Sequence, residues 1–309
     1  MRTFTESTAY PVRVIAGVDG SPNSAAALAW AAADARLRGG ELVVVTACGR
    51  DMPGIPGTAP PTPAAAEKAC RDIQAQLLQA LPAEAAPPVT TQVLHGDPVQ
   101  VLTRTATEQD MLVVGTRGRS RLRTLLLGSV AQGCAERAAC PVVVVPSPPR
   151  AAAAQPPAHG PVVAGVGSSA EARTALRFAA AEAILRKIPL IPVHAVYPDY
   201  ASTQTGSGRG TADNDDLLPP LDRARAQLDI LIRSELAGTS LTARPIAVYG
   251  DPERVLLTWT ESAALVVVGT RGTGRIHAAL LGSVSTYLLQ HGHCPIAVVP
   301  TPPSLGITP

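Results

Sequence analysis

The sequence predicts an α/β protein of two tandem, doubly wound domains, flavodoxin-like or Rossmann-like, each a five-stranded parallel sheet flanked by helices. The first observation is a repeat: segments 115–129 and 269–283 both read Gly-x2-Gly-x9-Gly-Ser and begin 154 residues apart (269 − 115). The second is that strand-like and helix-like segments alternate in the same order in both halves of the 309-residue chain. A repeat of half the chain indicates a duplicated domain.

The elements of the first half follow from apolar runs and their boundary residues. Segment 12–18 is apolar and rich in β-branched residues, and Pro22 then begins an Ala-rich helical stretch that Gly39 and Gly40 end. Further strands are expected at 42–47, 89–94, 111–115 and 142–145, and helices at 22–38, 64–80, 99–108 and 129–137.

The second half repeats this order, with strands expected at 162–166, 190–195, 241–248, 265–269 and 296–299. Its Gly-Asp-Pro turn at 250–252 matches the turn at 96–98 with the same spacing. Segment 148–160 is rich in Pro and Ala and has no apolar period, so it is the expected linker between domains 12–147 and 161–301. Residues 200–216 are polar and are expected to form a loop.

Composition and charge argue against several classes of protein and of binding site. The formal net charge of +2 gives no case for binding nucleic acid or a membrane surface. The five cysteines form no C-x-x-C pair, so neither a disulfide framework nor a zinc site is expected. The first ten residues have no apolar signal core and no stretch approaches 18 apolar residues, which makes the cytoplasm the expected location.

The loop after the fourth strand carries the clearest binding signal. Gly115 and Gly118 would let the backbone approach a ligand, and Gly128 and Ser129 immediately precede an apolar-periodic helix. With Ser129 as the expected N-cap, the helix N-terminus would present N–H groups and a positive dipole end to a phosphate. The alternative is an ordinary βα turn that needs glycines only for packing.

The arginines of the glycine loops, and Asp19 and Ser21 after the first strand, each have two interpretations. Arg117 and Arg271 lie between the paired glycines, where they could contact phosphate oxygens or simply form part of a solvated surface. Asp19 and Ser21 follow the first strand. They could serve a nucleoside or Mg²⁺, or only cap the helix that begins at Pro22.

Several common site motifs are missing from the sequence. It contains no Walker P-loop, no G-x-G-x-x-G at the first βα turn and no G-x-S-x-G elbow, which excludes the corresponding nucleotide and hydrolase sites. His95, His194, His291 and His293 share no metal-ligand spacing between the halves and are expected at strand ends or on the surface.

Taken together, the glycine loops, the Val-Asp-Gly-Ser after the first strand, the Gly-Asp-Pro turns and the Cys-Pro-Val terminal strand resemble the universal stress protein family. The resemblance covers residues 12–146 and 161–300, and the arrangement is similar to that of the tandem members from actinobacteria. It implies ATP as the ligand, with Mg²⁺ as an optional companion. The implied first-half site comprises Gly17, Val18, Asp19, Ser21, Ala47, Val114, Gly115, Arg117, Gly118, Gly128, Ser129 and Val130. The implied second-half site comprises Val166, Ser169, Ala195, Gly269, Arg271, Gly272, Gly282, Ser283 and Val284.

One departure from the family pattern concerns the second half, where Gly167 replaces the acidic residue found at Asp19. Loss of a charge-assisted hydrogen bond costs about 1.5–3 kcal/mol, or roughly 10- to 150-fold in affinity. We therefore expect the second site to bind ATP more weakly than the first, to take another adenine ligand, or to bind nothing.

The resemblance also implies that the last strands, 142–145 and 296–299, pair to make an intrachain pseudo-dimer, with a further homodimer left open. The expected function is an ATP-binding stress or dormancy regulator with little or no catalysis and an unspecified protein partner downstream. The alternatives are a slow Mg²⁺-dependent ATPase that uses Asp19 and a nucleotide-free interaction module.

Overall fold

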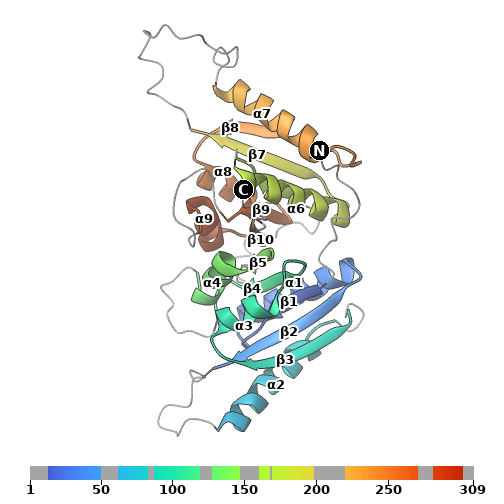
Figure 1. The fold of residues 1–309 in the computed structure, drawn as a ribbon, viewed down its shortest axis with the longest axis vertical. Coiled ribbons are helices and arrows are strands. Elements are labelled where there is room, and N and C mark those ends of the chain that lie inside the picture. The colour runs from blue at the N-terminus through green and yellow to red at the C-terminus, as the bar shows by residue number, and fades with distance from the viewer. Residues whose placement is uncertain are drawn as a thin grey trace, which may run out of the picture.

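The computed structural model describes residues 13–49, 62–82, 87–118, 127–146, 160–167, 169–197, 220–270 and 281–301. They form one continuous ten-stranded sheet with the strand order β3-β2-β1-β4-β5-β10-β9-β6-β7-β8 (Figure 1). The first half contributes β1 Arg13–Gly17, α1 Pro22–Leu37, β2 Glu41–Cys48, α2 Pro63–Gln79, β3 Val89–His95, α3 Pro98–Thr105, β4 Met111–Gly115, α4 Ser129–Arg137 and β5 Val142–Val145. The second half contributes β6 Val162–Gly165, α6 Ala170–Arg186, β7 Leu190–Val196, α7 Pro220–Glu235, β8 Ile246–Tyr249, α8 Pro252–Trp259, β9 Leu265–Gly269, α9 Ser283–His291 and β10 Ile296–Val299.

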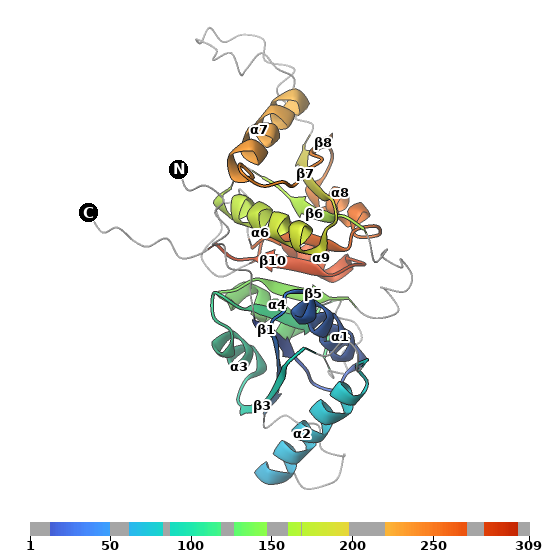
Figure 2. The same ribbon diagram turned by 90° about the vertical axis from the view of Figure 1, so that its right-hand side faces the viewer.

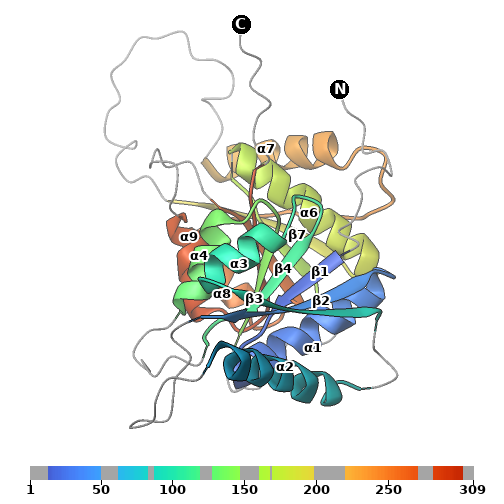
Figure 3. The same cartoon turned by 60° about the horizontal axis from the view of Figure 1, so that its bottom comes forward.

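The predicted fold class is confirmed. Within each half all strands are parallel, and the first strand lies between the second and the fourth, so the chain winds outward in both directions from that point. In the first half, α1 and α2 lie on one side of the sheet, and α3 and α4 lie on the other (Figure 3).

Two predicted boundaries are wrong for local reasons. The strand expected from 241 begins only at Ile246, because Pro245 directly before it has no N–H to donate to a ladder. The helix expected to reach residue 108 ends at Thr105, because Asp110 accepts hydrogen bonds from the Thr107 backbone (2.7 Å) and hydroxyl (2.8 Å) and closes a turn there.

Two hydrophobic cores cover the two faces of the sheet, and each runs through both halves. One contains residues of α1 and α6 together with Val143 of β5 and Ala297 of β10. The other contains residues of α3, α4, α8 and α9 together with Val144 and Ile296. Figure 2 looks onto the face with α1 and α6. Because each core continues from the first half into the second, the two halves are joined by hydrophobic packing on both faces of the sheet. All five cysteines are buried and free of disulfides, as expected.

The halves join through β5 and β10, the pairing that the sequence led us to expect. The two strands are antiparallel and Val143 pairs with Ala297, its own counterpart 154 residues later. A pseudo-two-fold axis therefore passes through this pair. Because the strands of each half are mutually parallel, the antiparallel junction sends their carboxyl ends to opposite ends of the sheet.

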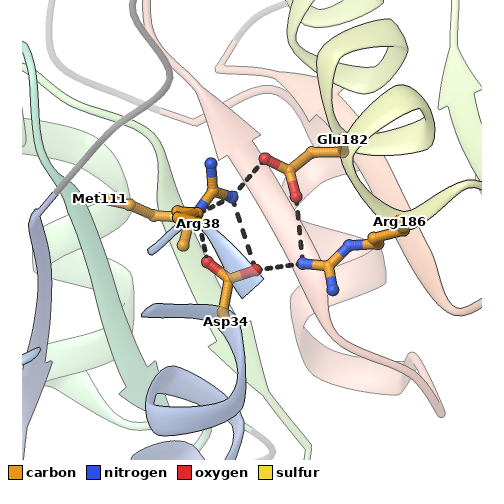
Figure 4. Close-up of polar contacts among 5 residues, drawn as sticks. All are labelled: Asp34, Arg38, Met111, Glu182 and Arg186. Atoms are coloured by element: carbon orange, nitrogen blue, oxygen red, sulfur yellow. Dashed lines mark hydrogen bonds and ion pairs between the residues drawn. The ribbon is translucent and has the colours of Figure 1, made fainter. Parts of the chain in front are cut away.

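Four charged side chains at the C-terminal ends of α1 and α6 meet beside this junction, with Arg38 as the C-cap of α1; we call Asp34, Arg38, Glu182 and Arg186 the interface quartet (Figure 4). Within each helix, Arg38 Nε lies 2.6 Å from Asp34 Oδ2, and Arg186 Nη2 lies 3.0 Å from Glu182 Oε2. Between the helices, Arg38 binds Glu182 and Arg186 binds Asp34. The charges alternate around the ring, so each contact joins opposite signs.

The interface quartet is buried, which makes it sensitive to the loss of any member. The side chains of Asp34, Arg38 and Glu182 are each 1% exposed. Burial raises the pKa of the Glu182 carboxyl, and the two arginines oppose that shift. The Arg186 guanidinium also lies 5.3 Å from the ring centroid of Trp30 in α1, a further contact between the halves.

Among the described residues, none of the helices combines the length and the apolar character that crossing a bilayer requires.

Removal of one charge from the interface quartet should destabilise the protein strongly. Glu182→Ala leaves Arg38 buried without one of its carboxylate partners, so we expect a loss of about 3–5 kcal/mol in the free energy of unfolding. Urea denaturation measures this. Asp72→Ala removes half of the exposed Lys68–Asp72 pair and should cost less than about 1 kcal/mol. Similar costs for the two variants would contradict a special role for the buried ring.

Candidate functional site

The loops after β1 and β4 meet at the point where the winding direction of the first sheet reverses. β1 and β4 are hydrogen-bonded neighbours, so both loops leave the same end of the sheet side by side. A β-carbon built on Gly118 would lie 2.5 Å from Asp19 Oδ2. The Asp19 carboxylate therefore lies beside Gly118, and any side chain at 118 would displace it from this position. In doubly wound sheets this is the place where ligands bind.

Asp19 and Ser21 differ in what they do in this loop. Ser21 caps α1, because its hydroxyl oxygen accepts a hydrogen bond of 3.2 Å from the Ser24 backbone N–H. Asp19 Oδ1 accepts from the Ser21 N–H at 2.9 Å, which holds the carboxylate in place, while Oδ2 faces Gly118. The capping interpretation is thus correct for Ser21, and Asp19 has one oxygen directed toward the glycine loop.

The glycine loop is closed at its base by backbone hydrogen bonds. Gly128 N–H donates to the Thr116 carbonyl at 2.7 Å, and Thr116 N–H donates to the Val145 carbonyl at 3.0 Å. A β-carbon on Gly128 would lie 3.2 Å from Arg117 Cα. Residues ten apart in sequence, Gly118 and Gly128, are therefore brought to the same small region as Arg117.

The prediction that Ser129 caps α4 is wrong. Gly128 is the N-cap, Ser129 is the first helical residue, and no side chain forms a cap hydrogen bond at this end. The reason is that the Gly128 carbonyl already accepts the first helical hydrogen bond, from the Gln132 N–H at 3.1 Å, which sets the start of the helix one residue earlier. The α4 N-terminus consequently presents its first-turn N–H groups beside Gly118 without a side-chain cap.

The glycines fall into two groups. A β-carbon on Gly115 would lie 2.7 Å from the Asn23 carbonyl oxygen, and one on Gly17 would lie 2.8 Å from Leu102 Cδ1. At these two positions the packing interpretation holds, because the missing side chain makes room for α1 and α3. Gly118 is different, since its neighbour is a polar side-chain atom of the other loop.

The remaining first-half candidates surround this region at the carboxyl ends of the strands. Val18 and Val114 are buried and belong to opposite cores, and Ala47 and Val130 pack at the edge of the second core. Val18 N–H donates to the Val45 carbonyl at 2.9 Å, which extends the β1–β2 ladder to the loop.

The second half repeats the same backbone frame at the opposite end of the sheet. Gly282 N–H donates to the Thr270 carbonyl at 2.8 Å, Thr270 N–H donates to the Val299 carbonyl at 3.2 Å, and Val166 N–H donates to the Val193 carbonyl at 2.9 Å.

The second-half candidates occupy matching places in that frame. Ser169 caps α6, and Gly282 is the N-cap of α9 with Ser283 and Val284 as its first residues. Gly269 packs closely on Glu171, and Ala195 lies on β7. Arg271 and Gly272 lie outside the described residues.

Three positions distinguish the second site. A β-carbon built on Gly167 would meet no atom of the described residues within 4 Å, so none of these fills the place of the carboxylate. His194 precedes Ala195 where Thr46 precedes Ala47. Burial lowers the pKa of His194, opposed by a hydrogen bond with the Val166 backbone. Glu171 packs on Gly269 where Asn23 packs on Gly115.

His194 and Glu171 are neighbours of the site that the sequence motifs do not reveal. Alignment of the two halves on Val18 and Val166 would have placed both beside it, because that alignment matches His194 with Thr46 and Glu171 with Asn23. Within the described part of the chain, no three His, Cys, Asp or Glu side chains form a group that could hold a metal ion.

Comparison with known proteins places this geometry in a family. The model of the universal stress protein family matches residues 12–146 and 159–300. The chain is 32% identical over 302 residues to the universal stress protein Rv2005c of Mycobacterium tuberculosis, covering 92% of this chain and 96% of that protein. It is 28% identical over 298 residues to universal stress protein Rv2623 of the same organism, covering 92% and 95%. A crystal structure of a universal stress protein from Archaeoglobus fulgidus shares the fold with a TM-score of 0.65 at 18% identity, covering 94% of this chain and 97% of that one.

The two groups of glycines should respond differently to alanine. Gly115→Ala forces a methyl group against the α1 backbone and should cost about 1–3 kcal/mol of stability. Gly167→Ala enters open space and should change stability by less than about 0.5 kcal/mol. Thermal unfolding of both variants measures the difference, and equal melting temperatures would show that Gly115 is not a packing residue.

Proposed function

The chain belongs to the universal stress protein family, and we propose that it is an ATP-binding regulator of a stress or dormancy response with little or no catalysis. The single observation that supports this most is the contact of the Asp19 carboxylate with the Gly118 backbone where the loops of β1 and β4 meet. We further propose residues 12–147 and 161–301 as its two domains, joined by segment 148–160.

The groups in the first-half site match the parts of a nucleotide. A carboxylate oxygen directed into the loop region accepts hydrogen bonds from ribose hydroxyls or an adenine amine. The backbone at Val18 and Ala47 lies at the strand ends beside it, where adenine would lie. The α4 N-terminus, with Gly128, Ser129 and Val130, offers N–H groups and roughly half a positive charge to the phosphates.

The fit for ATP rests on the space that the glycines keep open. A side chain at Gly118 would press on the Asp19 carboxylate and one at Gly128 would press on the Thr116 carbonyl, so glycine at both positions lets the two loops and the α4 N-terminus come together where a phosphate would bind. Arg117, between Thr116 and Gly118, can add a charge-assisted hydrogen bond to the phosphate oxygens. The bound ATP would keep its phosphoanhydride bonds and act as a signal. Mg²⁺ would bind together with the nucleotide.

Two substitutions test the site without disturbing the fold. Asp19→Asn keeps the side-chain size and removes the charge, so we expect a loss of affinity for ATP of roughly 10- to 150-fold. Gly118→Ala displaces the carboxylate and should weaken ATP binding at least as much. Isothermal titration, together with mass spectrometry of nucleotide released from denatured protein, measures both effects, with Asp72→Asn on the exposed face of α2 as the matched control.

Unchanged ATP binding in both variants would refute the proposed site. An absence of ATP binding in the native chain would favour the nucleotide-free interaction module. Hydrolysis well above background that Asp19→Ala abolishes would favour the Mg²⁺-dependent ATPase.

A further inference from the structure

We infer that the second half is a nucleotide site disabled at Gly167, so that this one position decides that the first half alone holds ATP at full affinity. The inference rests on the proposed function of the first half. It concerns a specificity-determining residue, and it goes further than an expectation of weaker binding because the described backbone frame of the second site matches that of the first.

The backbone frame supports an intact second site. The loop after β9 is closed by the Gly282–Thr270 and Thr270–Val299 hydrogen bonds of 2.8 and 3.2 Å. Their first-half counterparts, Gly128–Thr116 and Thr116–Val145, measure 2.7 and 3.0 Å. Because the same atoms make the same bonds at matching distances, the second half has kept the geometry at the base of the loop.

The helix N-termini support the same conclusion. Ser169 caps α6 as Ser21 caps α1, each with its hydroxyl accepting from an N–H three residues later at 3.2 Å. Gly282 and Gly128 each begin a nine-residue helix without a side-chain cap. Both halves therefore present the same first-turn N–H groups at the glycine loop.

The missing element is the carboxylate, and the structure has room for it. A β-carbon on Gly167 meets no atom within 4 Å in the part of the chain that the structure describes. Gly167 is also not among the described glycines with positive φ, so an L side chain is compatible with its backbone. Aspartate at 167 can therefore be added without the strain or collision that most glycine substitutions in the described part of this chain would cause.

The charged and titratable neighbours of residue 167 determine how much ATP affinity an added carboxylate restores to the second site. Glu171, in the first turn of α6, packs its β-carbon and backbone against Gly269, so an added carboxylate at 167 would lie four residues before a second acidic residue. The first half has the neutral Asn23 at that place. His194 lies half-buried at the end of β7 with its pKa lowered by burial, so it does not supply a compensating positive charge at neutral pH.

The test is to add the carboxylate and count the nucleotides. Isothermal titration with ATP should give about one site per chain for the native protein and about two for Gly167→Asp/Glu171→Asn, with Gly167→Asp alone giving a second site of intermediate affinity. Gly167→Asn is the matched control, equal in size but uncharged, and its second-site affinity should be roughly 10- to 150-fold lower than that of Gly167→Asp. In Asp19→Gly/Gly167→Asp the single site should move to the second half.

Each outcome separates the inference from the proposed function. One site in the native chain, and still one in both Gly167→Asp variants with unchanged melting temperatures, overturns the inference and leaves the first-half site standing. Two sites of equal affinity in the native chain overturn it as well. No ATP binding in the native chain or in Asp72→Asn overturns the proposed function itself.

Discussion

The antiparallel pairing of β5 with β10 is the constraint on which the rest of the structure depends. It converts two exposed sheet edges into the centre of a ten-stranded sheet and lets both hydrophobic cores run through the junction. The interface quartet closes the same junction on one face, with every charge paired across or along the two helices. Because the pairing is antiparallel, it also places the two candidate sites at opposite ends of the sheet.

Within each half, the candidate site depends on the first and fourth strands being neighbours in the sheet. In the first half this pairing brings Asp19, which follows β1, against Gly118. Gly118 lies ten positions before the N-cap of α4. Neither loop forms a binding surface by itself. The helix that begins directly after Asp19 and Ser21 carries Asp34 and Arg38 at its other end, so α1 connects the site to the junction between the halves.

Much of this can be predicted from the sequence, and the failures have physical causes. Apolar runs locate the strands, and the resemblance to the family implies the pairing of the last strands that the structure shows. The expectation that Ser129 is a cap fails because residue preference cannot show that the Gly128 carbonyl is the one that accepts the first helical hydrogen bond. The interface quartet escapes prediction because Asp34 and Arg38 are spaced four apart, a pattern typical of a solvated helix face. Only the packing of α1 beside α6 buries them.

We propose that the Asp19 carboxylate beside Gly118 makes the first half a nucleotide site and that its absence at Gly167 leaves the second half without one. Hydrogen–deuterium exchange with and without ATP tests this most directly, because it reports on both loops in one experiment. The account predicts slower exchange at residues 17–21 and 115–130 and no change at residues 165–169 and 269–284. Equal protection of both sets of loops, or protection of neither, would contradict it.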